Sequence, residues 1–224
     1  MTVTNSKNLL PPTGEGIVID IGTGDGRFVS AAAKANPNKF FIGVDANVKP
    51  LEKPSMKLTR KPAKGGLPNA MFVQAAVEDL PAEFNGVADE IHIHFPWGSL
   101  LKAVAGADMQ ILSALRRIAA PECFLEIVIG IDPERDRNEL DRLDVKELTL
   151  VTLHSFLIPK YKAAGFQPIE CRRLERDEWS KLETTWARKL SGGDKRTAYF
   201  LSFIAENNPG DGAGGCPGGK APQP

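Results

Sequence analysis

The sequence has few cysteines and no long apolar run, and both absences exclude large classes of protein. Three cysteines, Cys123, Cys171 and Cys216, are scattered over 224 residues without a CxxC pair, which argues against a disulfide framework or a thiolate zinc motif. No apolar run approaches the roughly 20 residues that span a bilayer. The polar N-terminus lacks the apolar segment of a secretory signal. We therefore expect a cytoplasmic protein with reduced thiols and no membrane contact.

The sequence also lacks an excess of either charge. It holds 28 Lys and Arg against 28 Asp and Glu, so an acidic partner would have to be bound by a local patch. An apolar fraction of 42% is ordinary for a globular chain, and no internal repeat is visible. We expect one domain over residues 1–206, beginning with an arm or hairpin at 1–14, and a disordered Gly/Pro-rich tail at 207–224.

Apolar, β-branched segments alternate with helical patterns along most of the chain. Helical spacing is found at residues 27–34, 107–119 and 154–165, and strand patterns fall at 16–21, 40–44, 71–75, 89–95, 124–129, 166–173 and 197–204. This alternation predicts an α/β fold with a mostly parallel sheet. We assign two segments as linkers, a basic one at 46–70 and one at 175–196 that carries Trp186.

A glycine-rich turn, "VIDIGTGDGRF", joins the first strand to the first helix. Gly22, Gly24 and Gly26 let the backbone turn sharply and approach a ligand closely. Their GxGxG spacing differs from the GxGxxG fingerprint of dinucleotide enzymes. Asp20 stands two residues before the first glycine, where a carboxylate would repel a pyrophosphate but attract the ammonium group of an amino-acid-bearing sulfonium cofactor.

Two further acids follow the next two strands. Asp45 ends the second strand in "FIGVDAN", where it could accept both ribose hydroxyls of an adenosine, and Glu78 follows the third strand in a loop that could cover adenine. Each acid alone has a simpler interpretation, as a helix cap or a solvated side chain. Together they lie at successive carboxyl ends of strands, where open α/β sheets bind ligands, and they favour S-adenosylmethionine. The arrangement resembles the class I methyltransferases, a resemblance that implies a Rossmann-like, seven-stranded sheet with an antiparallel last strand and helices on both faces.

The fourth strand ends in "HFPWGSL". Pro96 cannot continue the ladder of a sheet, and Trp97 follows it directly, held between a proline and a glycine. Methyltransferases that act on exocyclic amines often carry Asn/Asp-Pro-Pro-Tyr/Phe here, and this chain lacks the amide or carboxylate of that motif. What remains is a flat aromatic surface, which suits a substrate ring held by stacking.

Four motifs, "DIGTGDGR", "GVDAN", "HFPWGSLL" and "TTWARKL", resemble those of the aminoglycoside-resistance ribosomal methyltransferases of the Kam/Npm type. The resemblance covers residues 1 to about 206 and implies methylation of adenine N1 in the decoding site of 16S rRNA, on the small ribosomal subunit. It implies that Trp97 and Trp186 stack on a flipped adenine beside Phe95 and Pro96. The implied cofactor-binding residues are Asp20, Gly22, Gly24, Asp45, Ala76, Glu78, Ser99 and Thr184.

Local basic patches could bind the RNA despite the zero net charge. The first patch has four lysines whose spacing predicts one face of a helix, and it consists of Lys53, Lys57, Arg60, Lys61 and Lys64. The second surrounds Trp186 and contains Arg188, Lys189 and Arg196. By resemblance, Arg196 is the best single phosphate contact, whereas Lys189 stands where an arginine is expected and lacks the guanidinium fork.

Adenine N1 has a lone pair and no proton, so this transfer needs neither a general base nor a metal. His92 and His94 share one face of the fourth strand, but no third ligand is evident, and we expect no metal. We interpret Trp179 as a packing residue and the protein as a monomer. Three alternatives remain open: a tRNA (guanine-N7)-methyltransferase, a nicotinamide-dependent oxidoreductase, and a non-catalytic RNA-binding protein.

Overall fold

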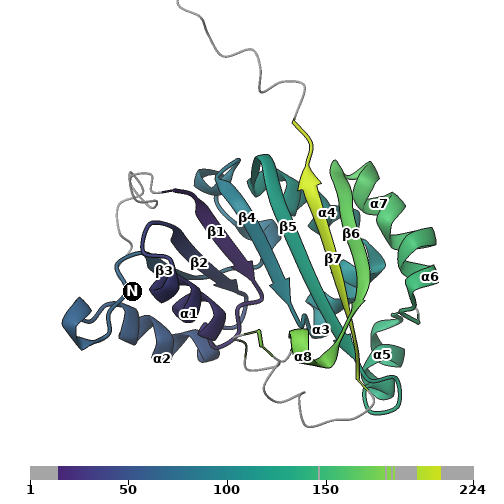
Figure 1. Cartoon of the computed structure of the whole chain (residues 1–224), viewed down its shortest axis with the longest axis horizontal. Helices are drawn as coiled ribbons and strands as arrows, with labels where there is room; N and C mark the ends of the chain where they lie inside the picture. Colours follow the sequence, from purple (N-terminus) through teal and green to yellow (C-terminus); the bar gives the residue numbers. More distant parts are fainter. Residues whose placement is uncertain (1–14, 146, 180, 183, 185–195, 208–224) are drawn as a thin grey trace, which may run out of the picture.

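A seven-stranded sheet runs through the whole molecule (Figure 1). The computed structural model describes residues 15–145, 147–179, 181–182, 184 and 196–207. The strand order is β3-β2-β1-β4-β5-β7-β6, and β7 runs antiparallel to both of its neighbours while the other pairs are parallel. The strands are β1 (Ile17–Ile21), β2 (Phe40–Asp45), β3 (Ala70–Gln74), β4 (Ala88–His94), β5 (Ala119–Ile131), β6 (Phe166–Leu174) and β7 (Thr197–Ala205). This confirms the predicted fold.

Helices cover both faces of the sheet, as expected. They are α1 (Arg27–Ala35), α2 (Val48–Leu58), α3 (Gly98–Gly106), α4 (Met109–Ile118), α5 (Arg137–Leu143), α6 (Leu150–Thr152), α7 (Ile158–Ala163) and α8 (Arg176–Trp179). The prediction omitted α3. It also began the 154–165 helix too late, because α6 runs through a π-helical turn at Leu153–Leu157 directly into α7.

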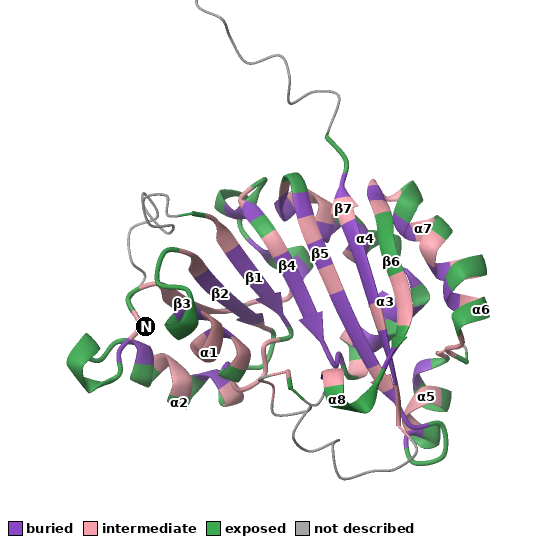
Figure 2. Cartoon of the chain, viewed as in Figure 1, coloured by how far each residue is buried: buried purple, intermediate pink, exposed green. Residues whose placement is uncertain are grey.

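Residue alternation along the strands builds a separate core on each face of the sheet. Ile19, Ile91 and Ile127 belong to the large core that includes the buried side chains of α3 and α4. Val18 and Phe41 point to the opposite face, where they pack with Val29 of α1. Because a core packs on each face of the sheet, the central strands are almost entirely buried (Figure 2). It also explains their continuous apolar sequence, which is typical of parallel strands.

The parallel direction of β1, β2 and β4 places their following loops at one edge of the sheet. That edge therefore receives the glycine turn, Asp45 and the Phe-Pro-Trp-Gly turn, which are far apart in the sequence. No helix of the described residues has the length and hydropathy to cross a bilayer. The predicted arm at 1–14 and residues 208–224 of the predicted tail lie outside the described residues.

The basic segment after β2 differs from the prediction. Helix α2 ends at Leu58, so Lys53 and Lys57 share a helix face but Lys61 and Lys64 do not. The chain reverses there: the amide of Leu67 donates to the carbonyl of Leu58 at 3.2 Å, and a short 3₁₀ helix spans Pro62–Lys64. Pro62 has no N–H to continue a helix. The predicted single row of four lysines is therefore wrong, although all five basic side chains are exposed.

Candidate active site

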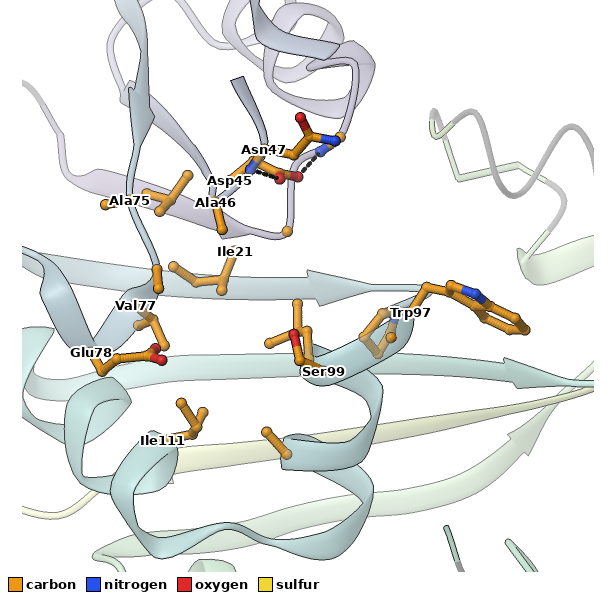
Figure 3. A pocket seen from close by; sticks show the side chains of 18 of the residues that line it. Ile21, Asp45, Ala46, Asn47, Ala75, Val77, Glu78, Trp97, Ser99 and Ile111 are labelled. Atoms are coloured by element: carbon orange, nitrogen blue, oxygen red, sulfur yellow. Dashed lines mark hydrogen bonds between the residues drawn. The ribbon is translucent and has the colours of Figure 1, made fainter. Parts of the chain in front are cut away.

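A cavity of about 420 Å³ opens at the carboxyl edge of the sheet, between the loops that follow β1, β2, β3 and β4 (Figure 3). Nine of the predicted site residues line it: Gly22, Gly24, Asp45, Ala76, Glu78, Phe95, Pro96, Trp97 and Ser99. A smaller cavity of about 280 Å³ shares Gly22 and Gly24 with the first and is lined also by Asp20 and Thr184. Every predicted cofactor-binding residue thus lines one of two adjoining cavities.

The glycine turn is held in place by Asp45. One carboxylate oxygen of Asp45 accepts the N–H of Gly24 at 2.8 Å, and the other accepts the N–H of Asn47 at 2.8 Å. Gly22 has φ 76°, in the left-handed region that favours glycine, and a Cβ there would lie 2.5 Å from Cδ2 of Leu100. The backbone of this turn therefore forms one wall of the cavity, and a side chain at Gly22 would occupy the space beside it.

Asp20 lies below the glycine turn with only 4% of its surface exposed. Burial raises the pKa of its carboxyl group, and the nearby imidazoles of His94 and His92 oppose that rise. Asp20 and His94 both line the smaller cavity. A buried carboxylate at the wall of a cavity is suited to pairing with a cationic ligand group, because water competes weakly there.

The turn after β4 is shaped by apolar packing. Phe95 has φ 50°, uncommon for a residue other than glycine, and its amide donates to the carbonyl of Val128 at 2.7 Å. Its ring lies over Gly130, where a Cβ would be 2.8 Å away. Trp179 contacts the same ring edge-on, at 6.0 Å between centroids. The packing interpretation of Trp179 is confirmed, since only 2% of it is exposed.

Above this packed turn, Trp97 is presented at the mouth of the cavity. It is 38% exposed, although Phe95 and Pro96 before it are buried. Its indole extends outward from the other lining side chains (Figure 3). Ser99 follows in the first turn of α3 and also lines the cavity. The turn thus converts a buried strand into an exposed aromatic surface within three residues.

The structure places Arg196, predicted to contact phosphate, in an ion pair within the chain. Its guanidinium is bonded to Asp136 at 2.6 Å and to the carbonyl of Gly130 at 3.0 Å, and 9% of the side chain is exposed. This ion pair ties the start of β7 to the loop after β5, and the phosphate contact stays a prediction. Trp186, Arg188 and Lys189 lie outside the described residues.

Sequence reasoning missed the apolar floor of the cavity. Val77, Leu100, Ala103 and Ile111 line it from the loop after β3 and from α3 and α4. Leu100 and Ala103 lie three apart on α3, so the helical spacing could have indicated a shared face. This spacing is informative only once α3 has been predicted. The sequence gives no Ser, Thr, Asp or Asn cap for that helix, because Trp97 occupies its N-cap position.

Comparison with known proteins agrees with this geometry. Residues 8–205 match the model of the NpmA family, described as 16S rRNA (adenine(1408)-N(1))-methyltransferase. The chain belongs to this family. A relative from Escherichia coli with that description is 36% identical over 188 residues, which cover 82% of this chain and 84% of the relative. The chain is accordingly a class I, S-adenosylmethionine-dependent methyltransferase, as the sequence predicted.

Two solved structures of related proteins have the same fold. The aminoglycoside resistance methyltransferase NpmB1 is 47% identical, with a TM-score of 0.74 over 86% of this chain and 88% of that one. A 16S rRNA (adenine(1408)-N(1))-methyltransferase from Catenulisporales acidiphilia, solved with its cosubstrate SAM, is 36% identical, with a TM-score of 0.80 over 89% of each chain. Family membership excludes a nicotinamide-dependent oxidoreductase.

Relatives named tRNA (guanine-N(7)-)-methyltransferase match less well. One from Bacillus cytotoxicus is 37% identical over only 84 residues, and one from Campylobacter jejuni is 27% identical over 188 residues. The tRNA alternative therefore reflects the shared superfamily fold rather than the family of this chain.

Proposed function

We propose that this enzyme transfers a methyl group from S-adenosylmethionine to N1 of a decoding-site adenine in 16S rRNA of the small ribosomal subunit, and so confers aminoglycoside resistance. It would act in the cytoplasm, where its substrate is found. The observation that carries the proposal is the exposed indole of Trp97 at the mouth of a cavity lined by Asp45 and the glycine turn. It would act as a monomer.

The residues present fit the cofactor. Asp20 offers a buried carboxylate for the ammonium of the methionine end, and Asp45 offers carboxylate oxygens at the ribose position. Val77, Leu100 and Ile111 give the apolar floor that an adenine ring requires, with Glu78 at its edge. Ser99 and Thr184 would contact the methionine end.

The bound cofactor supplies an electrophilic methyl group on a sulfonium. Adenine N1 attacks with its own lone pair, the N–C bond forms as the S–C bond breaks, and the sulfur keeps the bonding electrons. The positive charge therefore passes to the adenine ring, and no proton moves. The contribution of the chain is to hold N1 in line with the methyl carbon, and orientation of this kind can supply about 7–11 kcal/mol.

The target base would leave the RNA stack and lie on Trp97, with Trp186 on its other face. Extrusion of a base costs a few kcal/mol, and stacking returns about 1–3 kcal/mol per base. An indole face also stabilises the cationic product ring. Trp97 can take this role because Phe95 and Trp179 fix its backbone while its own ring remains accessible.

The RNA surface would include the exposed side chains of Lys53, Lys57, Arg60, Lys61 and Lys64. This segment leaves the cavity rim directly, since Asn47 lines the cavity and caps α2. Its reversal after Leu58 spreads the basic groups over two short helices and a loop. Such a surface suits the shape of a folded RNA better than a single straight row would.

The decisive experiment is methyl transfer to purified small subunits, followed by mapping of the reverse-transcription stop. We expect label in 16S rRNA and one new stop at the decoding-site adenine. Deproteinised 16S rRNA and bulk tRNA are tested in parallel as competing substrates. Label in tRNA guanine instead would support the tRNA alternative, and subunit binding without label would support the non-catalytic one.

The role of the basic segment is tested by the salt dependence of subunit binding. Replacement of Lys57, Lys61 and Lys64 by Gln should lower the slope of log affinity against log salt by roughly 2–3 in total. Lys162, exposed on α7, gives a matched control whose replacement should leave the slope unchanged. An unchanged slope in the triple variant would remove this segment from the RNA surface.

A further inference from the structure

A row of polar side chains crosses three strands beneath the active site, on the face of the sheet covered by α1. Asp20 of β1 pairs in register with His92 of β4, and His92 pairs with Glu126 of β5. Residues in register on neighbouring parallel strands point to the same side. His94, two residues further along β4, shares that side. Only 9% of His92 and 7% of His94 is exposed.

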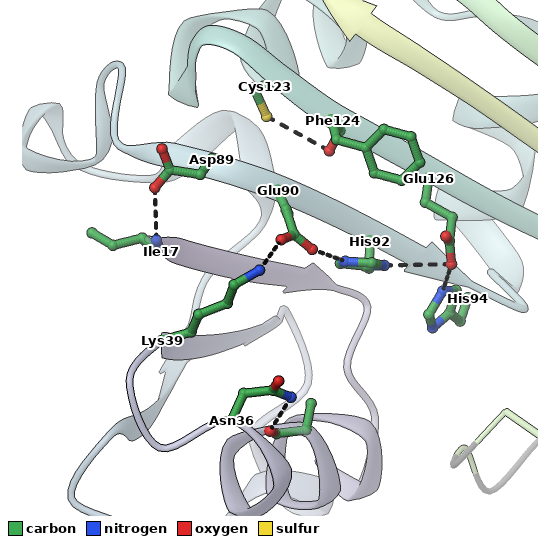
Figure 4. A network of polar contacts seen from close by, with 11 residues as sticks. Ile17, Asn36, Lys39, Asp89, Glu90, His92, His94, Cys123, Phe124 and Glu126 are labelled. Carbon is green, nitrogen blue, oxygen red and sulfur yellow. Dashed lines mark hydrogen bonds and ion pairs between the residues drawn. The ribbon is translucent and has the colours of Figure 1, made fainter. Parts of the chain in front are cut away.

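The donor atoms of these side chains converge. Nε2 of His94 lies 2.7 Å from Oε1 of Glu126, and Nδ1 of His92 lies 3.4 Å from the same oxygen (Figure 4). One atom from each of the three residues lies within 4.8 Å of the others. In a tetrahedral zinc site with bonds of 2.0–2.2 Å, ligand atoms are about 3.3–3.6 Å apart. Small shifts of the side chains would therefore bring the three onto one ion.

Two buried ring nitrogens at this site make no hydrogen bond to any described residue. They are Nδ1 of His94 and Nδ1 of His92, and the second of these has an ion-pair contact with Oε1 of Glu126 at 3.4 Å. Buried polar atoms are almost always satisfied, and an exception calls for an explanation such as an ion. The register of the three strands alone would explain why these side chains approach one another. It does not explain why Nδ1 of His92 is directed into the cluster without a hydrogen bond.

A second layer of contacts orients the same imidazole. Nε2 of His92 lies 3.2 Å from Glu90, and the other carboxylate oxygen of Glu90 lies 2.5 Å from Nζ of Lys39. Metal-binding histidines usually donate their second nitrogen to a carboxylate in this way. The ring of Phe28 packs on both imidazoles, with centroids 5.1 Å and 4.8 Å away, and so limits their rotation.

We propose that His92, His94 and Glu126 bind one divalent transition-metal ion, with Zn²⁺ as the best fit to two imidazoles and a carboxylate. The ion joins β4 to β5 directly below the methyl-transfer site. The smaller cavity, lined by His94 and Asp20, gives a water molecule access to the fourth position. The ion takes no part in methyl transfer, which needs no Lewis acid.

Metal binding is measured on untagged, full-length protein that has been treated with a chelator. Calorimetric titration with Zn²⁺ should give saturable binding of one ion per chain and a higher melting temperature. Co²⁺ should give the absorption of a tetrahedral complex without a sulfur-to-metal charge-transfer band. That spectrum separates this site from binding by the three cysteines.

Variants assign the ligands. His94→Ala and Glu126→Gln should each weaken binding at least about 100-fold, and Glu90→Gln, which changes only the outer contact, about 10–100-fold. The matched control is His154→Ala, which removes the remaining histidine of the chain, an exposed one, and should leave the affinity unchanged. Melting temperatures measured without metal identify any variant that fails to fold. Glu90→Gln changes a partly exposed side chain and is therefore the variant least expected to disturb folding.

Two results would overturn the proposal. The first is the absence of saturable Zn²⁺ and Co²⁺ binding by the chelator-treated protein. The second is binding that folded Glu126→Gln or His94→Ala protein retains at the original affinity, or a Co²⁺ spectrum dominated by sulfur.

Discussion

Two turns at neighbouring strand ends form the two halves of the active site, and they are stabilised in opposite ways. The turn after β1 contains Gly22 and Gly24 in left-handed conformations and is fixed by the hydrogen bond that the N–H of Gly24 donates to Asp45. The turn after β4 is fixed by the buried ring of Phe95, packed on Trp179. A glycine-rich turn presents its backbone to a ligand, whereas an apolar turn can hold a large side chain out from its own core.

The largest effect is expected from removal of the support beneath the apolar turn. Trp179→Ala should lower the free energy of unfolding by about 3–5 kcal/mol, because it leaves a cavity under Phe95. Denaturant unfolding of both proteins checks this. The polar turn after β1 should keep its structure in the molecules that remain folded. Their affinity for the cofactor should therefore be unchanged. A loss below 1 kcal/mol would mean that the Phe95 turn is stabilised in some other way.

Trp97→Ala should affect activity rather than stability. Loss of the stacking surface should lower kcat/KM on small subunits about 100-fold, which corresponds to about 2.7 kcal/mol, while stability changes by less than about 0.5 kcal/mol because the side chain is exposed. Trp97→Phe keeps an aromatic face and should recover most of the activity. If cofactor affinity fell in parallel with activity, the indole would belong to the cofactor site instead.

The polar turn is tested by Asp45→Asn. The amide oxygen can accept only one of the two backbone N–H groups that Asp45 accepts, and the side chain carries no charge, so we expect cofactor affinity to fall about tenfold, or about 1.4 kcal/mol. Equilibrium binding of labelled S-adenosylmethionine measures this. Asp141→Asn is a suitable control, since that exposed carboxylate lies on α5 and lines neither cavity. Equal affinity in Asp45→Asn and the parent would exclude a charged contact at this position.

Gly22→Ala should lower stability less than Trp179→Ala does. At φ 76° an alanine is strained, at a cost of about 1 kcal/mol, and its Cβ would displace the side chain of Leu100 toward the cavity. Cofactor affinity should therefore fall more than stability does. Calorimetric binding and thermal unfolding of the same sample give both numbers. Gly65→Ala, with φ 83° and open space around the Cβ position, separates backbone strain from obstruction.

The strands and the motif-bearing turns could be predicted from sequence because each depends on local information. A buried parallel strand is a continuous apolar run, and the glycines and Pro96 mark where such runs end. Helix α3 was missed because Trp97 replaces the usual polar cap. The end of α2 was placed too late because the reversal after Leu58 depends on a close approach: a Cβ on Gly66 would lie 1.7 Å from the carbonyl oxygen of Arg60.

Two residue roles depended on partners that are distant in the sequence. Arg196 was predicted to contact phosphate, but Asp136, 60 residues away, holds it in a nearly buried ion pair. His92 and His94 were set aside for want of a third ligand, and the register of β4 and β5 brings Glu126 beside them. Neither partner could have been identified from spacing, because strand order and register decide which distant residues meet.

The sequence by itself determined the family, the order of strands along the chain, the cofactor and the residues of the two turns, since these are written in short motifs. Only the tertiary structure decided which charges remain exposed, what supports Trp97, and how β1, β4 and β5 align Asp20, His92 and Glu126 in one row. The physical reason is that hydrogen bonding between strands and packing between layers are non-local. They bring together side chains whose separation in the sequence carries no record of the contact.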